Sequence, residues 1–339
     1  MQLIQERNKR RWDMTKKSSK QILKDLWSGY NFVVIFLIIF IVFLVINGGA
    51  TSWTGITNIL LHSAIIGTIA LGMGMVVLTG DIDLSVGSSF VLIGGLTILF
   101  YNKTNSIALA VLFSIICGGI CGFVNGVLVG KFKMPPFIVT LAAMLIYRSI
   151  SQYMMNEMGE TRYRVEASLS SYESLFMFGN GNVATIPNLA IVFLLIAGIM
   201  IYVTTSTKFG KNIYAVGSNA RAARLAGASV EWTRIKMYII CGSLVGIAAF
   251  LKIAKDTSFD PATSGQGFEL YAIAAIVIGG INMAGGKGKM VGIIFGTMAF
   301  TIIDKIITSL GMNALLNDTV KGIILLVAVG LQTIRRRAK

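Results

Sequence analysis

Charged residues are scarce in this chain. Asp, Glu, Lys and Arg make up 13% of its 339 residues, whereas hydrophobic residues make up 55% and the mean hydropathy is +0.74. A soluble domain carries about 25% charged residues because its surface faces water. So little polar surface excludes a water-soluble globule of this size, and the surplus apolar area must face lipid. The sequence therefore predicts an all-α polytopic membrane protein.

Residues that support catalysis are also few. The three cysteines, Cys117, Cys121 and Cys241, all lie in apolar runs, which argues against a disulfide framework or a metal cluster. Lys287 and Lys289 lie in a glycine-rich segment, but neither is followed by the Ser or Thr that a phosphate-binding loop requires. The sequence predicts a protein that is not an enzyme, with no catalytic residues, no cofactor and no metal.

Long apolar stretches divide the chain into candidate membrane spans. A spanning helix needs about 20 mostly apolar residues to cross the hydrocarbon core. About ten such stretches are present, at residues 32–46, 56–79, 86–101, 106–130, 136–155, 187–206, 237–253, 269–283, 290–309 and 319–334. The third and eighth are short enough to be tilted or partly broken.

The 30 Lys and Arg residues test this arrangement. With ten spans and a cytoplasmic N-terminus, the outer segments and the outer end of the seventh span hold only Lys103, Arg162, Arg164, Lys252 and Lys255. Most of the others fall in inner segments, as the positive-inside rule requires. Both termini are therefore predicted to be cytoplasmic. The net charge of +15 reflects membrane orientation and headgroup contact rather than a nucleic-acid surface.

The chain is predicted to form one transmembrane domain, residues 32–334. A basic cytoplasmic leader, 1–31, precedes it and a basic cytoplasmic tail, 335–339, follows it. The leader is too long for the charged part of a signal peptide and more spans follow the first, so the first apolar stretch is expected to be an uncleaved helix. The longest inner loop spans residues 207–236.

Two carboxylates, Asp81 and Asp83, stand between the second and third spans, in the segment Thr79–Gly87. An ionisable residue at membrane depth is a functional candidate. The alternative is that both acids cap the start of the third span, where the helix dipole favours negative charge. The capping interpretation is the stronger one for Asp81, and the two are evenly matched for Asp83.

The inner loop 207–236 contains a short helical signal. Ser218 or Asn219 can cap its start, and Gly227 stands just past its end. The intervening Ala and Arg residues form a helix with small side chains on one side. Such a helix suits docking into a groove of another protein. The alternative is a helix lying on lipid headgroups, which its weak apolar face argues against.

Several motifs, taken in order, resemble the permease subunits of bacterial monosaccharide ABC importers of the ribose type. The resemblance covers residues 55–334 approximately. It rests on Gly80–Gly87, Asn125-Gly126, Pro136–Leu141, Phe209-Gly210 with Ala215-Val216-Gly217 and Asn219, Ala222-Ala223 with Ala226-Gly227, and Glu269-Leu270 with Ala274-Ala275, Gly279-Gly280 and Gly285-Gly286. Many independent motifs in the same order are far more specific than any one of them.

The resemblance implies a multi-pass homodimer in the bacterial plasma membrane that works by alternating access. An ABC ATPase subunit would bind inside and an extracytoplasmic sugar-binding protein outside. The helix that couples to the ATPase is assigned to Asn219, Arg221, Ala222, Ala223, Arg224 and Gly227. Candidates for the translocation path are Asp83, Asn125, Thr140, Glu269 and Asn282. The alternative role for each of these five is a hydrogen bond between helices.

Other readings of the sequence stay open at this stage. A stand-alone ion-coupled secondary transporter would use Asp81 and Asp83 as its coupling site, and such folds carry internal repeats. The segment Val77–Gly80 echoes Val277–Gly280, each at the end of a span that runs inward. A scaffold protein is disfavoured by the many glycines. The carried sugar could be ribose, another pentose, a hexose or a furanose-like signal molecule.

Overall fold

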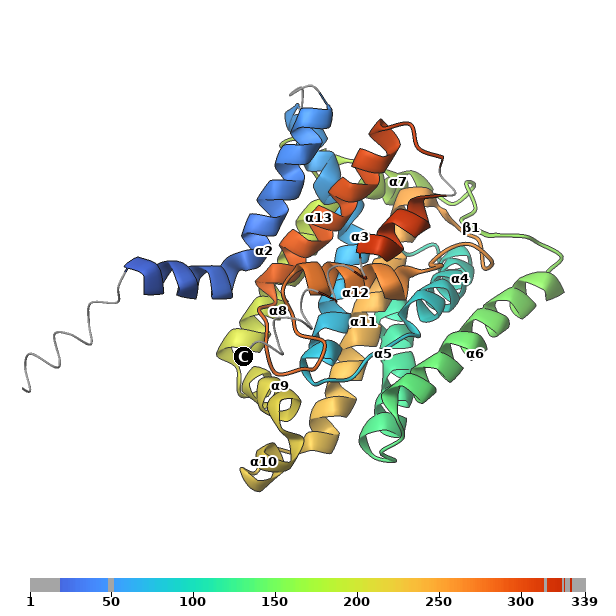
Figure 1. Cartoon of the computed structure of the whole chain (residues 1–339). Helices are drawn as coiled ribbons and strands as arrows, with labels where there is room; N and C mark the ends of the chain where they lie inside the picture. The colour runs from blue at the N-terminus through green and yellow to red at the C-terminus, as the bar shows by residue number, and fades with distance from the viewer. Residues whose placement is uncertain (1–18, 48–51, 314–315, 325, 327–329, 331–339) are drawn as a thin grey trace, which may run out of the picture.

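Helices form most of the structure (Figure 1). The computed structural model describes residues 19–47, 52–313, 316–324, 326 and 330. The helices are α2 (Ser19–Ile46), α3 (Trp53–Leu78), α4 (Val86–Thr104), α5 (Ile107–Gly130), α6 (Pro136–Glu157), α7 (Tyr172–Asn180), α8 (Asn188–Ser206), α9 (Lys208–Ser218), α10 (Ala220–Leu225), α11 (Val230–Asp256), α12 (Phe268–Ile278) and α13 (Val291–Ser309). Short strands pair antiparallel, β1 (Tyr163–Arg164) with β4 (Ser258–Phe259) and β2 (Asn182–Val183) with β3 (Ile186–Pro187).

Within the described residues, 7 helices are long and apolar enough to cross a membrane, namely α3, α4, α5, α6, α8, α11 and α13. Two shorter apolar helices accompany them, Phe32–Ile46 within α2 and α12. The predicted all-α polytopic membrane fold is therefore confirmed. The last predicted span, 319–334, lies partly outside the described residues, as does the leader up to residue 18, and the tail lies wholly outside. Ten crossings and cytoplasmic termini stay predictions.

Several boundaries differ from the sequence prediction. Helix α11 begins at Val230, inside the predicted loop 207–236, rather than at residue 237. The eighth span was predicted to run to Met283, but α12 ends at Ile278 because Gly280, at φ +81, turns the chain into the left-handed region. Residues 208–218, predicted as loop, form α9, whose start is capped by the Thr207 hydroxyl accepting from the Gly210 amide at 3.0 Å. Helix α2 begins at Ser19, inside the predicted leader.

The long helix α11 is the centre of the bundle and packs most extensively on α5, with α3 and α4 also against it. Small residues make the α5–α11 contact possible. A Cβ on Gly246 would overlap the carbonyl of Ser114, and one on Gly118 would overlap the carbonyl of Gly242. The two backbones thus touch, as is typical of membrane helices that meet through small residues.

The two ends of the bundle differ in character. Helices α9 and α10 lie at one end, the α10 end, whereas α7 and β1 lie at the other, the α7 end (Figure 1). At the α7 end the β1–β4 pair crosses α4, where Gly94 and Gly95 leave room for the rings of Phe259 and Tyr163. Helix α12 runs across the bundle, roughly crosswise to α11 in this view.

The close α5–α11 contact predicts that Gly246→Ala destabilises the protein. Its new methyl group would overlap the backbone of α5, and we expect a loss of about 1–3 kcal/mol. The measurement is the apparent melting temperature of the purified protein in detergent, which should fall by a few degrees.

The matched control is Gly198→Ala in α8, where an added Cβ meets nothing within 4 Å. This variant should melt at or slightly above the wild-type temperature, because alanine favours a helix. Equal melting temperatures for the two variants would contradict the packing described.

Candidate functional site

The first turn, Thr79–Ser85, separates α3 from α4 at a sharp reversal of the chain. The amide of Gly80 donates to the carbonyl of Val77 at 2.9 Å, and the amide of Asp81 donates to Val76 at 3.3 Å. Gly80 has φ +83, a conformation that a side chain would oppose. These bonds end α3 and aim the two following carboxylates at the neighbouring helices.

Asp83 and Asn125 meet at Ser85. The carboxylate of Asp83 accepts hydrogen bonds from the Ser85 amide at 2.9 Å and from its hydroxyl at 2.6 Å. The hydroxyl oxygen of Ser85 in turn accepts from Asn125 Nδ2 on α5 at 2.9 Å. All three side chains are buried. Asp83 thus fixes Ser85, the residue before α4, and Ser85 in turn is bonded to α5. This arrangement links two helices, which a local helix cap would not do.

Asp81 does not cap α4, and the capping interpretation is wrong for this residue. Its Oδ2 lies 3.0 Å from Nε of Arg234, near the start of α11, and its side chain is only 2% exposed. Burial raises the pKa of the Asp81 carboxyl to about 6, and the Arg234 guanidinium opposes the rise. At pH 7 the carboxyl is therefore mostly ionised and paired.

The backbone carbonyl of Ile82 ties the first turn to two more helices. The hydroxyl of Tyr238 on α11 donates to it at 3.3 Å. The hydroxyl of Thr140 on α6 lies 3.4 Å from it, and forms its shorter hydrogen bond, 2.9 Å, with the carbonyl of Pro136. Three predicted path residues, Asp83, Asn125 and Thr140, therefore converge on this turn.

The other two predicted path residues lie elsewhere. Glu269, in the first turn of α12, places its carboxylate against Gly87, because a Cβ at Gly87 would stand 2.6 Å from Oε2. Asn282 lies after α12, where its Oδ1 accepts from the Ala284 amide at 2.9 Å. It shapes a local turn and is not part of the cluster around Ser85.

Arg148 on α6 is a polar residue that the sequence analysis did not select. Its guanidinium donates to the carbonyls of Pro261 at 3.0 Å and Ser264 at 2.7 Å. This fixes the segment that leads into α12. A lone arginine inside a predicted span was the available signal, since such residues rarely lack a function.

The second turn, Gly279–Met290, connects α12 to α13 and packs on the first. Like Gly80, Gly280 has positive φ and follows the last turn of its helix, so the sequence echo corresponds to a shared backbone geometry. The amide of Gly286 donates to the carbonyl of Leu78, the last residue of α3, at 2.8 Å. This bond joins the second turn to the end of α3, and Gly285 packs on the first turn, where an added Cβ would stand 2.7 Å from the Gly80 amide nitrogen.

Helix α9 rests on both turns at once. Gly217 packs so closely that a Cβ there would overlap the carbonyl of Leu78 and stand 2.6 Å from the amide of Gly286. The hydroxyl of Tyr214 donates to the carbonyl of Gly288 at 3.0 Å. Any displacement of the C-terminal half of α9 therefore acts on the first and the second turn together.

Helix α10 follows α9 and has the caps that the sequence predicted. Asn219 Oδ1 accepts from the amides of Arg221 and Ala222, each at 3.0 Å, and Gly227 has φ +86 past the end of the helix. Ala223 is buried, whereas Arg224 is exposed and lies 3.6 Å from the carboxylate of Glu231.

The exposed apolar residues beside α10 were not selected from the sequence. Leu225 is 86% exposed and Trp232, in the first turn of α11, is 60% exposed. Ala223 packs instead with Val216 and Val230 in a small core that holds α10 in place. A leucine at the tip of an Ala/Arg helix was the only sequence signal. Exposed apolar residues on a firmly held helix are typical of a protein interface.

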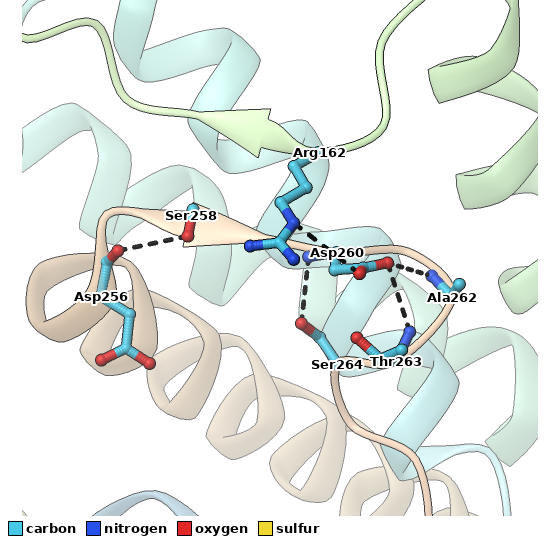
Figure 2. A network of polar contacts seen from close by, with 7 residues as sticks. All are labelled: Arg162, Asp256, Ser258, Asp260, Ala262, Thr263 and Ser264. Atoms are coloured by element: carbon cyan, nitrogen blue, oxygen red, sulfur yellow. Dashed lines mark hydrogen bonds and ion pairs between the residues drawn. The ribbon is translucent and has the colours of Figure 1, made fainter.

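A polar network shapes the loop at the α7 end (Figure 2). The carboxylate of Asp260 accepts from the amides of Ala262 at 2.8 Å and Thr263 at 3.3 Å, and lies 3.9 Å from Arg162 Nε. The Asp260 amide donates to the Ser264 hydroxyl at 3.0 Å. This order extends from Arg162, just before β1, to the segment that Arg148 holds.

The raised pKa of Asp81 predicts a pH effect on stability. The folded protein takes up this proton near pH 6 and the unfolded chain near the ordinary value of 3.8, so acid favours the folded state between these values. From pH 7 to pH 5, wild type should gain about 1 kcal/mol relative to Asp81→Asn. Apparent melting temperatures of both proteins at the two pH values measure this, and parallel curves would contradict it.

Comparison of the sequence with known proteins places this chain in a family. Residues 55–329 match the family model described as branched-chain amino acid transport system / permease component. The chain is 34% identical over 277 residues to the ribose import permease protein RbsC of Escherichia coli (strain K12), covering 80% of this chain and 83% of that protein. It is also 34% identical over 298 residues to RbsC of Bacillus subtilis (strain 168), covering 88% and 90%.

A third relative is the autoinducer 2 import system permease protein LsrC of Salmonella typhimurium (strain LT2), 33% identical over 271 residues, which is 80% of this chain and 76% of the relative. No solved structure matches the chain. The family match covers most of the chain, including both turns, α9 and α10. The chain therefore belongs to this family of import permeases, the membrane-embedded components of transport systems.

Proposed function

We propose that this chain is the transmembrane subunit of an ATP-driven importer that carries a monosaccharide or sugar-like solute into the cytoplasm by alternating access. Ribose import and autoinducer 2 import by its relatives support this class of solute. Ribose is the first sugar to assay, followed by other pentoses, hexoses and furanose-like signal molecules.

The observation that carries this proposal is the form of α10. A free surface helix of six residues would fray, since helices this short are unstable alone. Here Asn219 caps the start and Ala223 anchors the underside, so that Leu225 is held out toward solvent. A rigid apolar tip flanked by Arg221 and Arg224 suits docking into a groove of an ATPase subunit.

The proposed topology has ten crossings with both termini in the cytoplasm. The basic residues of α9, α10 and the following segment lie at the α10 end, which this topology makes cytoplasmic (Figure 1). The α7 end then faces outward, and the ordered loop around Asp260 becomes part of the surface offered to an extracytoplasmic binding protein.

The proposed coupling route runs from α10 through α9 to the two turns. A force applied at Leu225 reaches α9 through the small core around Ala223. Helix α9 then moves the first and second turns through Gly217 and Tyr214. Because the first turn is bonded to α5, α6 and α11, its displacement reaches three membrane helices.

The five predicted path residues divide into two proposed roles. Asp83, Asn125 and Thr140 are buried. The first two meet at the Ser85 hydroxyl, and Thr140 lies beside the Ile82 carbonyl, which supports a role in positioning the first turn. Glu269, partly exposed near Arg148, stays the proposed lining of the path, and Asn282 the proposed rigid corner of the second turn. The remaining partners we propose are an ABC ATPase, a sugar-binding protein, membrane lipid and a second copy of this chain.

An ion-coupled carrier acting alone is the weaker candidate. Its coupling site would need Asp81 and Asp83, but Asp81 is paired with Arg234 and Asp83 is satisfied by Ser85. The family match to import permeases also favours the ATP-driven system. A stand-alone carrier would move sugar in liposomes under a cation gradient, with no ATPase present.

The proposal predicts that Leu225→Asp releases the ATPase. The full chain, purified in mild detergent from membranes of its native host, should bring with it a nucleotide-hydrolysing protein identifiable by mass spectrometry. A carboxylate at the apolar tip cannot be desolvated without cost, so the recovered ATPase activity should fall at least about tenfold.

The control is Leu310→Asp, an exposed leucine just after α13 at the end remote from α10, which should retain the partner. Wild-type protein that purifies without any ATPase, yet transports sugar alone, would overturn the importer. Equal recovery from the two variants would overturn only the docking role of α10.

A further inference from the structure

A cavity of about 730 Å³ lies among α2, α3, α11, α12 and α13, away from both turns. It opens near the ends of these helices that are remote from α10, because Asn47, Asp256 and Ser309 lie on its wall. This volume is in the range of small-molecule sites. Nothing in the proposed coupling route uses it.

The cavity combines an apolar floor with a basic rim. Phe43, Phe268 and Phe300 supply aromatic surface, and Tyr271 lies beside Phe300 with ring centroids 5.3 Å apart. His62, the only histidine of the chain, also faces this space. Such a lining accepts a ligand that is partly apolar and partly polar.

The charges around the cavity do not balance. Lys252 pairs with Asp256, and Asp304 pairs with Lys321 at 2.8 Å. Lys255 and Lys305 also line the cavity, are partly buried, and form no ion pair with any described residue.

The sequence that follows α2 and the sequence that follows α13 offer few further carboxylates. Residues 48–51 and 325–339 contain no Asp or Glu, and neither do residues 314 and 315. Asp318 accepts a hydrogen bond from the hydroxyl of Tyr271 at 2.6 Å and lies 3.9 Å from Lys321, so its charge is directed to that lysine. The lining thus carries three lysines, Lys252, Lys255 and Lys305, against two aspartates, Asp256 and Asp304, and an anion at Lys255 and Lys305 would gain charge-assisted hydrogen bonds.

We infer that this cavity binds a phosphate-bearing anionic ligand, with its phosphate between Lys255 and Lys305 and its apolar part over Phe268 and Phe300. The site lies at the outer ends of membrane helices in the proposed topology, at the level of lipid headgroups. An anionic phospholipid or a soluble organic phosphate offers this chemistry. The site is separate from sugar transport and does not depend on it.

The test measures thermal stabilisation of the full-length protein in detergent by three probes: phosphatidylglycerol, the zwitterionic phosphatidylcholine, and glycerol 3-phosphate. Phosphatidylglycerol should raise the apparent melting temperature and bind at least about tenfold more tightly than phosphatidylcholine. In Lys255→Gln with Lys305→Gln, this preference should be lost. Lys103→Gln, an exposed lysine at the same end, controls for general charge and should behave as wild type.

Thr308→Trp provides a second variant if the lysine variants fold poorly, because it adds bulk at the cavity wall and leaves the charge unchanged. It should weaken binding by a similar factor. Stabilisation by glycerol 3-phosphate and not by lipid would support the site and assign a soluble ligand. No stabilisation by either anionic probe, or full binding in the double lysine variant, would overturn the inference.

Discussion

Polar groups inside an apolar bundle must find partners there, and the first turn meets this requirement through three different helices. The Asp81 carboxylate pairs with α11, the Ser85 hydroxyl accepts from α5, and the Ile82 carbonyl lies within hydrogen-bond reach of hydroxyls on α6 and α11. Burial opposes ionisation of Asp81 more than Arg234 favours it, so this pair adds little to stability. The pair instead fixes the position of the turn, because the ionised carboxylate of Asp81 has its charge compensated only beside Arg234 among the described residues.

This constraint explains why the turn suits transmission of motion. A flexible loop would absorb a displacement of α9, whereas a turn joined to three helices by hydrogen bonds and an ion pair must carry its partners with it. The direct bond from Gly286 to Leu78 adds the second turn to the same unit. Glycines at 217 and 286 let the three segments touch through their backbones, where there is little slack.

Sequence reasoning succeeded where the determinants are local. The cap of α10 depends on residues within three positions of Asn219, and the end at Gly227 depends on one backbone angle. Apolar stretches likewise located the long helices, since hydrophobic length is a property of each segment alone. The composition also excluded a water-soluble globule before any motif was considered.

It failed where the partner is distant in the chain. No residue near Asp81 in the sequence indicates its ion pair with Arg234, which is more than 150 positions away. A local helix cap was therefore expected, and that expectation was wrong. The end of α12 was misplaced because Ile281 and Met283 continue the apolar pattern beyond the glycine turn. The unbalanced lysines of the cavity come from α11 and α13 and are brought together only by the fold.

The central claim, that α9 moves the two turns, is tested most directly by Gly217→Ala in the complete importer reconstituted in liposomes. Ala215→Ser, at an exposed position of the same helix, is the control. The account predicts that Gly217→Ala keeps more than about half of the ATP hydrolysis, because α10 still docks, while sugar uptake falls at least about tenfold. Uptake and hydrolysis that stay unchanged, or that fall in parallel, would contradict it.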